Sequence, residues 1–301
     1  MSQPFPIAVF CYNRPEHLKR TISALQKNVG AELSEVWFFS DGPGGEKDLA
    51  LVEAVRVVLN NVQGFKKVRV LKSKENQGLA MTIIKGVRAV LEENPACIVL
   101  EDDLETSPYF LDFLNRGLSF YSDDPDVFSV SGYCPPIDIP GDYEAEAYRF
   151  PRINSWGWGT WRDRWNSVDW DVKGFDTFIS NKNAVKKLSG QGKDLPVMLL
   201  KQQTGTIGSW AVRFNQACFK AGRTNIYPVK SLVRNRGADG TGTHMKNSGK
   251  YFTRLSEKPL QPQPAYENAE ISKAFRNFYR PSLYRQIINK IKIARYLQRI
   301  R

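Results

Sequence analysis

The stretch CIVLEDDLETSPYF (residues 97–110) joins an apolar run to a cluster of acids. Four apolar residues, CIVL, are followed at once by Glu101, Asp102 and Asp103. A short apolar run bounded by polar residues predicts a buried strand. Adjacent carboxylates repel one another unless a cation or hydrogen-bond donors lie close by. The stretch therefore predicts a strand that delivers carboxylates to a site at its carboxyl end.

Three similar apolar runs come before this one, and helix-like segments separate all four. The runs are PIAVFCYN (residues 6–13), EVWFFSDG (35–42) and KVRVLKS (67–73). Helices are predicted from Pro15 onward, over residues 46–61 and within residues 76–94. Apolar strands that alternate with amphipathic helices predict an α/β fold with a mostly parallel sheet that helices flank on both faces.

Each predicted strand ends in polar residues. The ends read YNRP (residues 12–15), SDGPGG (40–45), KSKENQG (72–78) and EDDLE (101–105). In sheets of this kind, ligands bind at the carboxyl ends of the strands. One ligand site is therefore expected at this edge. Besides the three acids, its expected residues are Asn13, Arg14, Asp41, Asn76 and Gly78.

The three acids suit a divalent metal ion. Mg²⁺ and Mn²⁺ prefer oxygen ligands, and are often held by one or two carboxylates together with substrate phosphates. Such an ion would neutralise the acids and a bound diphosphate, and would stabilise the diphosphate as a leaving group. A solvated helix cap is the alternative, since Asp102 and Asp103 precede the helix-like LETSPYFLDFL. The three other polar strand ends favour the metal site.

Three further side chains each allow two interpretations. Asp41 could accept a hydrogen bond from a base or a ribose hydroxyl, or could be a turn residue before Gly42. His244, in the loop GADGTGTHMKN, could complete a metal shell or touch a phosphate, or could be exposed to solvent. His17 lies near the start of the first helix and is expected to be structural or exposed.

Motifs of several other protein classes are missing. The GPGG run (residues 42–45) lacks the Lys-Ser/Thr ending of a Walker loop, and no GxGxxG follows the first strand. The four cysteines include no CxxC pair, so a structural zinc site or a redox motif is not expected. These observations weigh against P-loop and Rossmann dinucleotide-binding proteins.

Four tryptophans crowd into SWGWGTWRDRW (residues 155–165). The spacing from Trp158 to Trp165 predicts one face of a helix, and core packing there is the plain interpretation. Trp156 and Trp158 are expected at the start of that helix. An indole in that position could stack on the apolar face of a sugar or on a base.

The motifs NRP, SDG, NQG and EDDLETSPYF, in this order, resemble nucleotide-sugar glycosyltransferases of the GT-A fold. The nearest resemblance is to the N-acetylglucosaminyltransferase type I family, whose acidic motif and following Gly-Trp helix are similar to EDDLETSPYF and GWGTWRDRW. Similar stretches occur in bacterial family-two-like transferases. The resemblance covers roughly residues 5–245. It implies a metal-dependent enzyme that moves a sugar from a nucleoside diphosphate donor, expected to be UDP-linked. The acceptor would be a glycan or lipid-linked saccharide in surface polysaccharide or glycoconjugate assembly.

That resemblance also implies a role for each polar group. Arg14 and Asp41 would contact the nucleotide, while Glu101 would face the donor sugar and Asp102 the ribose. The implied cofactor is Mn²⁺ or Mg²⁺, bound next to the diphosphate. The implied metal-side residues are Asp103 and His244.

The general base departs from the family pattern. The family has an Asp before a Trp in a late helix, whereas GTIGSWAVRF has Ser209 before Trp210. An inverting transfer would then need another group to take the acceptor's proton. Asp163, in TWRDRW, and Asp239, in the loop before His244, are the candidates, although Asp163 could merely pair with an arginine. The expected acceptor contacts are Trp156, Trp158 and Trp210.

Four segments are expected along the chain. Residues 1–126 would form the nucleotide-sugar-binding half, and residues 127–256 an irregular acceptor-binding half of the same GT-A domain. Residues 257–280 would be a linker and connecting helix. Residues 281–301 would form a basic amphipathic tail.

The formal net charge is +12, and much of it lies in the tail, where residues 281–301 hold six cations and no acid. Arg285, Lys292 and Arg299 recur every seven residues, and isoleucines lie between them. This pattern predicts an imperfect amphipathic helix that binds an anionic membrane surface. A basic helix docked on the body or on RNA is the alternative.

The remaining sequence suggests a cytoplasmic protein, since no secretory signal or run of roughly 20 apolar residues is seen. It would sit on the inner face of the membrane through its tail.

A sugar-1-phosphate nucleotidyltransferase is one rival function, but it would need a Gly-rich signature near the amino terminus. A nucleic-acid-binding protein is another, suggested by the pI of about 9.5 and disfavoured because the cations form no stripe with interleaved aromatics. A degenerate transferase that binds without turnover is the third.

Overall fold

The structure, a computed structural model, describes residues 3–237 and 249–300. Its first strands are parallel neighbours in the order β4-β1-β2-β3. They are β1 (Ile7–Cys11), β2 (Glu35–Ser40), β3 (Lys67–Lys72) and β4 (Ala96–Glu101). The helices between them are α1 (Pro15–Gln26), α2 (Glu46–Asn60) and α3 (Leu79–Glu93). The predicted alternation of strands and helices is confirmed.

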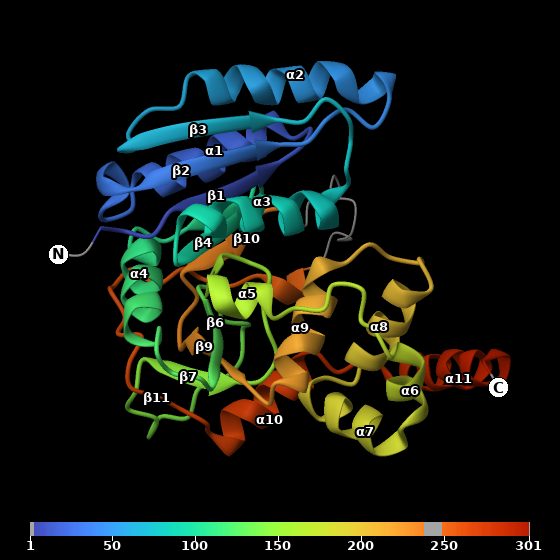
Figure 1. Cartoon of the computed structure of the whole chain (residues 1–301). Helices are drawn as coiled ribbons and strands as arrows, with labels where there is room; N and C mark the ends of the chain where they lie inside the picture. The colour runs from blue at the N-terminus through green and yellow to red at the C-terminus, as the bar shows by residue number, and fades with distance from the viewer. Residues whose placement is uncertain (1–2, 238–248, 301) are drawn as a thin grey trace.

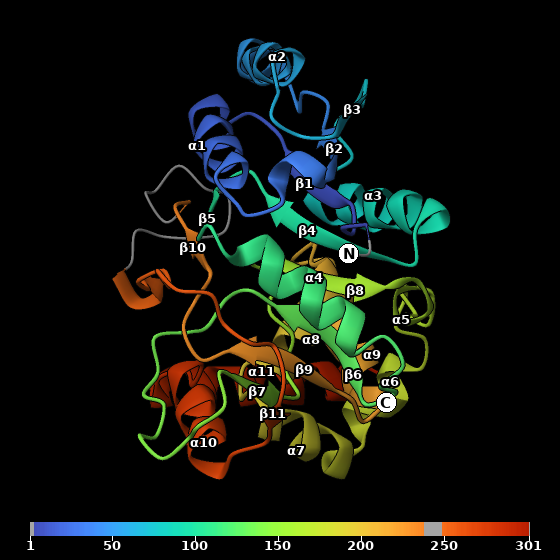
Figure 2. The ribbon, with the colours of Figure 1, turned by 90° about the vertical axis from the view of Figure 1, so that its left-hand side faces the viewer.

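Both faces of this sheet are covered by helices (Figure 2). Along β1, Ile7 and Val9 face the buried cluster that includes the apolar residues of α1 and α2. Ala8 and Phe10 face the opposite cluster, which includes α3. Successive strand residues point to opposite faces, so a strand covered on both sides reads as a continuous apolar run. This burial explains why the strands could be recognised in the sequence.

The same sheet continues into the second half of the chain and has nine strands, in the order β11-β7-β9-β6-β8-β4-β1-β2-β3. The added strands are β6 (Val127–Ser131), β7 (Ala147–Phe150), β8 (Trp158–Trp161), β9 (Thr224–Pro228) and β11 (Ala265–Tyr266). β8 runs antiparallel to both β4 and β6, and β7 antiparallel to β9. The sheet is thus mostly parallel and flanked by helices, as predicted.

The tryptophan segment differs from the prediction. Trp158 lies in β8, and only the short helix α5 (Arg162–Asn166), which contains Trp165, follows it. The predicted helix face from Trp158 to Trp165 is therefore wrong. Trp158 and Trp165 nevertheless stack, with ring centroids 5.8 Å apart, because strand and helix meet in the core.

The other helices surround the second half of the sheet (Figures 1 and 2). α4 (Phe110–Phe120) packs on β6 and β8, and α9 (Trp210–Lys220) packs on α3. Three helices form a separate bundle next to α9 and the final helix. The three are α6 (Phe175–Ser180), α7 (Lys182–Gln191) and α8 (Leu195–Gln203). The remaining helices are η1 (Ala31–Leu33), η2 (Gly249–Tyr251), α10 (Ala269–Phe278) and α11 (Leu283–Arg299).

A small second sheet lies at the carboxyl end of β4. It pairs β5 (Leu104–Thr106) with β10 (Val233–Asn235) in antiparallel register, so that Asn235 lies opposite Leu104. The pairing brings a segment more than a hundred residues away next to the acidic stretch. It thus adds polar groups to the edge where the sequence predicts a site.

Candidate active site

The three acids lie where the parallel strands end. Glu101 is the last residue of β4, and the Asp102 carboxylate accepts a hydrogen bond from the backbone N–H of Tyr12, at 3.2 Å. Thr21 of α1 donates its hydroxyl to the Asp102 carbonyl at 2.7 Å. Asp102 is buried, with 8% of its surface exposed. Asp102 is thus fixed against the end of β1 and against α1.

Burial makes this cluster electrostatically costly. Burial first, and then repulsion from Asp103 and Asp102, raises the pKa of Glu101 well above its usual range. Burial first, and then Asp103, raises the pKa of Asp102 to about 7. Burial also raises the pKa of Asp103, against the opposing effect of the Arg14 guanidinium. A cation bound beside these groups would stabilise their charged forms.

Arg14 supplies one such cation. Its Nη1 lies 2.9 Å from Asp103 Oδ2, and both side chains are about 15% exposed (14% and 15%). Asn235 donates to the other oxygen of Asp103 at 3.3 Å, while the backbone N–H of Arg236 donates to the Asp103 carbonyl at 2.8 Å. A Cβ on Gly237 would collide with the Asp103 carboxylate, so only glycine permits this close approach. Segments from both halves of the chain therefore hold Asp103.

Asp41 organises the neighbouring loop between β3 and α3. Its Oδ1 accepts hydrogen bonds from the N–H groups of Gly42 and Gln77, both at 2.9 Å, and its Oδ2 accepts from Gly78 at 3.0 Å. Asn76 donates to the Gly42 carbonyl at 2.9 Å. A carboxylate has further acceptor sites beyond these three. The structure thus gives Asp41 a definite loop-holding position at the same edge as the acids.

Tyr12 and Asp48 are site residues that the sequence reasoning missed. The Tyr12 hydroxyl and the Asn13 amide donate to the two oxygens of Asp48 at 2.8 and 3.0 Å. The backbone N–H of Gly44 donates to the Tyr12 hydroxyl at 2.9 Å. These contacts join the β1–α1 loop to the first turn of α2. The acid in the first turn of α2 was the available signal, but it reads equally well as a favourable helix-dipole charge.

The carboxylate oxygens at this edge of the sheet fit a metal ion that is also bound by the substrate. Among residues 3–237 and 249–300, no group of three or more His, Cys, Asp or Glu side chains could hold an ion alone. Mg²⁺ and Mn²⁺ are commonly held by one or two carboxylates plus substrate phosphates. Asp103 offers such a carboxylate beside two further acids whose charge burial disfavours. The site therefore fits an ion bound together with a diphosphate.

Two of the three expected acceptor tryptophans are core residues. Trp158 is 1% exposed and Trp210 is 3% exposed, and their rings stack with centroids 4.8 Å apart. Neither indole offers a face to a sugar, so the expectation that they contact the acceptor is wrong. The aromatic core formed with Phe214 instead joins β8 to α9.

Trp156 lies in a different environment. Trp158 pairs with Val99 in antiparallel register, so the residues before Trp158 run beside the last residues of β4. Trp156 is half-buried and makes edge-to-face contacts with Tyr133 and Tyr251, at centroid distances of 4.7 and 5.5 Å. It is the one tryptophan of the three that lies at the site edge and keeps part of its surface open.

Asp163 is not brought to the site. It follows Trp161, which pairs with Ala96 at the opposite end of β4 from Glu101. Its exposed carboxylate pairs with Arg164 at 2.8 Å. This placement contradicts the expectation that Asp163 is the general base, because the length of β4 separates it from the other acids. The alternative, pairing with an arginine, is what the structure contains.

Two predicted residues, Asp239 and His244, lie outside the described residues.

Ser209, at the family's base position, is the N-cap of α9, and its hydroxyl accepts a hydrogen bond from the N–H of Val212 at 3.3 Å. His17 lies 3.0 Å from Arg14 Nη2 through its Nε2 atom, which makes it a structural neighbour of the ion pair.

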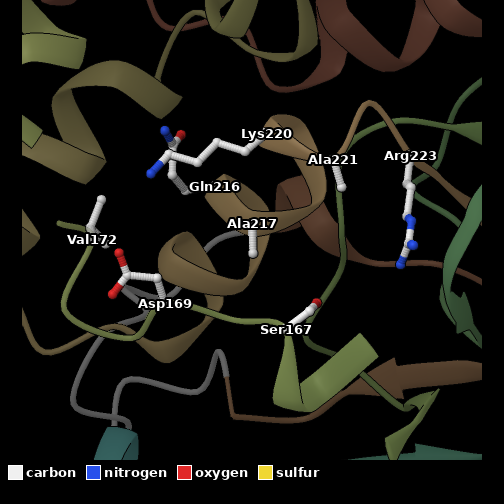
Figure 3. A pocket seen from close by; sticks show the side chains of 8 residues that line it. All are labelled: Ser167, Asp169, Val172, Gln216, Ala217, Lys220, Ala221 and Arg223. Atoms are coloured by element: carbon white, nitrogen blue, oxygen red, sulfur yellow. The ribbon is translucent and has the colours of Figure 1, made fainter. Parts of the chain in front are cut away.

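Two cavities differ in their relation to this edge. A groove of about 850 Å³ runs along α1 and reaches Glu105 and Arg236, which are neighbours of Asp103. A smaller cavity of about 280 Å³ lies between residues 167–172 and α9 (Figure 3). The smaller one also touches Arg223, just before β9, where the parallel strands begin. Of these two cavities, the groove along α1 is the one that lies next to the acidic stretch.

The sheet, its carboxyl-end acids and the loops around them define a nucleotide-sugar glycosyltransferase of the GT-A type. The model of glycosyl transferase family 2 matches residues 7–179, more than half of the chain. The protein belongs to that family and is a glycosyltransferase. The narrower resemblance to the N-acetylglucosaminyltransferase type I family stays a hypothesis.

Two solved structures are similar at low identity. The mannosyltransferase PcManGT from Pyrobaculum calidifontis, in complex with GDP-Man and Mn²⁺, is 12% identical, with a TM-score of 0.40, over 73% of this chain and 70% of its own. TarS from S. aureus is also 12% identical, with a TM-score of 0.38, over 78% of this chain and 37% of its own. This chain therefore spans only about a third of TarS.

Proposed function

We propose that this glycosyltransferase moves a sugar from a nucleoside diphosphate donor to a saccharide acceptor, with Mn²⁺ or Mg²⁺ beside Asp103. The observation that carries the proposal is the placement of Glu101, Asp102 and Asp103 at the carboxyl end of β4, with Arg14 against them. Buried acids of this kind need positive charge, and the divalent cation that binds with a donor diphosphate would supply it. We propose a UDP-linked sugar on the ground of the sequence resemblance alone.

In this proposal, residues 1–126 bind the donor. Arg14, which pairs with Asp103 at 2.9 Å, would hold phosphate oxygens of the donor through its guanidinium. Asp102 accepts from the ribose, and Glu101 faces the donor sugar. The loop at Asp41 lies against the nucleotide. The loop residues that would shape this pocket are Asn13, Asn76 and Gly78.

A metal ion bound by Asp103 and the diphosphate would stabilise the charge that develops on the departing nucleoside diphosphate. The protein's own groups orient the donor and keep Asp103 in place through Asn235 and the Arg236 backbone. We propose His244 as a further metal-side or phosphate-side group. Asp239 is the remaining candidate for the general base.

The acceptor is proposed to bind residues 127–256. Trp156 supplies a partly open indole beside the end of β4. The groove along α1 supplies a second approach to the acids, past Arg236 and Glu105. A glycan or a lipid-linked saccharide would fit either approach, in surface polysaccharide or glycoconjugate assembly.

Product analysis tests this function. Purified protein is incubated with UDP- and GDP-sugars, Mn²⁺ and a set of saccharide and lipid-linked saccharide acceptors, and the released nucleotide is identified. A glycosyltransferase releases a nucleoside diphosphate, whereas a sugar-1-phosphate nucleotidyltransferase exchanges a nucleoside monophosphate unit and produces or consumes pyrophosphate. Pyrophosphate exchange would overturn the proposal in favour of that rival. Nucleotide binding without turnover of any donor would favour a degenerate transferase.

A pair of variants adds a matched control. Asp103→Asn should abolish metal-dependent release, because the loss of charge stabilisation costs several kcal/mol in the transition state. Asp163→Asn removes an exposed acid at the other edge of the sheet and should keep at least half of the wild-type rate. Retention of full, Mn²⁺-dependent activity by Asp103→Asn would rule out the assigned site.

A further inference from the structure

The final helix, α11, docks on the body through one face. Ile293, Tyr296 and Leu297 pack against the buried apolar cluster of the α6–α8 bundle. The Tyr296 hydroxyl donates to Asp176 Oδ1 at 2.6 Å, and the Tyr296 ring contacts Phe175 with centroids 5.8 Å apart. These contacts fix the rotation of α11 about its own axis, and so decide which of its residues face outward.

The outward face carries an apolar stripe. Leu283, Ile287 and Ile291 follow one another at intervals of four residues, and Tyr284 lies beside them. Their exposed fractions are 72%, 59%, 45% and 75% in the order Leu283, Ile287, Ile291 and Tyr284. Residues at this spacing share one face of a helix. A docked helix needs only one apolar face, so the second one has no role in the fold of the described residues.

Cations flank this stripe. On a helical projection of 3.6 residues per turn, Arg295 and Arg299 fall along one side of the stripe and Lys290 along the other. Lys292 and Arg285 lie further round on the same side as the arginines. Within the described part of the chain, none of these five side chains forms an ion pair. The outer surface of α11 is therefore apolar at its centre and positive at its borders.

The positive charge extends onto α8. Burial first, and then the neighbouring Lys292 and Arg285, lowers the pKa of Lys201. Lys292 and Arg285 of α11 thus lie close enough to Lys201 of α8 to disfavour its charge. Anionic groups placed over this surface would relieve that repulsion.

We propose that α11 lies in the headgroup region of an anionic lipid membrane, with the stripe from Leu283 to Ile291 inserted and the flanking cations on lipid phosphates. A helix with one apolar and one basic side binds in this way, in the plane of the membrane. None of the helices in the described residues has the length and hydropathy to cross a bilayer. The sequence predicted membrane binding through the isoleucines that lie between the cations. Of these, Ile288 is partly covered in the structure, and the exposed apolar face consists of Leu283, Tyr284, Ile287 and Ile291.

Charge favours lipid over the other occupants. A second copy of this chain would bury the stripe but would bring two sets of cations together. RNA would neutralise the cations but would leave the stripe in water. An anionic leaflet, such as the cytoplasmic one, satisfies both features at once.

α11 lies on the same side of the molecule as the carboxyl edge of the first strands in Figure 1. The loops that follow β1–β4 and the helix α11 both lie towards the right-hand side of Figure 1. Membrane binding would then keep the acids near acceptors carried by lipids. This step rests on the proposed function, whereas membrane binding itself does not.

Vesicle cosedimentation without donor or acceptor tests the proposal independently of transfer. Wild-type protein should sediment with phosphatidylglycerol-containing vesicles and much less with phosphatidylcholine vesicles. Ile287→Glu with Ile291→Glu should weaken binding at least tenfold. Arg295→Gln with Arg299→Gln should weaken it about fivefold per charge removed.

Matched controls separate these effects from general changes. Val57→Glu places an acid at a 53% exposed apolar position of α2, and Lys186→Gln with Lys187→Gln removes two exposed cations of α7. Both should bind vesicles as the wild type does, and all variants should unfold at similar temperatures. Wild-type protein that does not bind anionic vesicles, or a stripe variant that binds like the wild type, would overturn the proposal. So would a stripe-dependent dimer, or RNA binding, in the absence of vesicle binding.

Discussion

Arg14 and Asp103, 89 residues apart in the chain, lie 2.9 Å apart at the carboxyl edge of the sheet. Arg14 ends the loop after β1, as the N-cap residue of α1, and Asp103 follows β4, which neighbours β1. The ion pair therefore depends on the parallel pairing of β1 with β4, which brings their carboxyl ends together. Arg14 is also a cation that opposes the rise in pKa which burial causes in all three acids.

Removing that cation should destabilise the metal-free protein. Arg14→Gln leaves Asp103 buried beside two other acids, and we expect a loss of about 2 kcal/mol, below the usual range for fully buried pairs. Mn²⁺ should restore part of the loss, because it would take the place of the guanidinium. Urea unfolding in a chelator and in Mn²⁺ measures both effects.

Arg116→Gln is the control for this substitution. Arg116 pairs with Asp112 on the surface of α4, with side chains 36% and 31% exposed. Its loss should change stability by about 0.5 kcal/mol or less. Equal effects of the two substitutions, or an Arg14→Gln loss that Mn²⁺ leaves unchanged, would contradict the account.

The raised pKa of Asp102 predicts a pH dependence of stability. Burial first raises this pKa from 3.8 to about 7. The folded protein thus keeps a proton that the unfolded chain releases. The contribution of Asp102 to stability is therefore greatest below about pH 4, and it is lost as the pH rises to about 7.

Asp102→Asn should remove that dependence. The metal-free variant should be more stable than the wild type by about 2–4 kcal/mol at about pH 8, with little difference at about pH 4. Urea unfolding in a chelator across this range gives the slope, and Asp112→Asn on the surface should leave it unchanged. If the free energy of unfolding of Asp102→Asn changed with pH as steeply as that of the wild type, another group would be responsible for the pH dependence.

Asp41→Ala should loosen the loop between β3 and α3. The substitution leaves the N–H group of Gln77 without its acceptor and leaves that of Gly78 with Asn76 Oδ1 alone, at a cost of about 1–3 kcal/mol. Hydrogen exchange at these two amides should accelerate, and the KM for the donor should rise. Asp169→Ala, which removes a carboxylate that accepts from Asp171 and Lys173 in an exposed turn, serves as the control. Unchanged exchange at Gln77 and Gly78 would refute the loop-holding role.

Substitutions of Trp158 and Trp156 should affect different properties, namely stability and acceptor binding. Trp158→Phe should lower the unfolding free energy by about 1–3 kcal/mol through loss of core packing, with no selective effect on acceptor KM. Trp156→Ala should raise acceptor KM with a smaller effect on stability. Steady-state kinetics with chemical unfolding compares them. A selective acceptor defect in Trp158→Phe would reinstate the stacking role that its burial excludes.

The first half of the fold could be predicted because its signals are local. β1, β2 and β4 are buried along almost their whole length and read as apolar runs, whereas the edge strand β3 is only partly buried. The apolar stripe of α1 appears directly in Leu18, Ile22 and Leu25. The polar strand ends then meet because parallel strands share an edge.

The rest depended on contacts between distant segments. Asn235 reaches Asp103 only because β10 pairs with β5. Both strands are only three residues long, and their sequences carry no pattern that predicts the pairing. The spacing of Trp158 and Trp165 imitated a helix because a strand residue and a helix residue stack in the core. Asp163 looked suitable by its neighbours, but β8 runs antiparallel to β4 and carries it to the opposite edge.

Metal-dependent nucleotide binding at Asp103 is the most direct test of the central claim. Thermal unfolding of the wild type is measured with UDP, GDP, TDP or CMP, each with and without Mn²⁺, and repeated for Asp103→Asn and for the surface control Asp112→Asn. A ligand stabilises the folded protein in proportion to the logarithm of its saturation. We predict a shift with one nucleoside diphosphate that requires Mn²⁺, persists in Asp112→Asn and is lost in Asp103→Asn. An undiminished Mn²⁺-dependent shift in Asp103→Asn would contradict the claim.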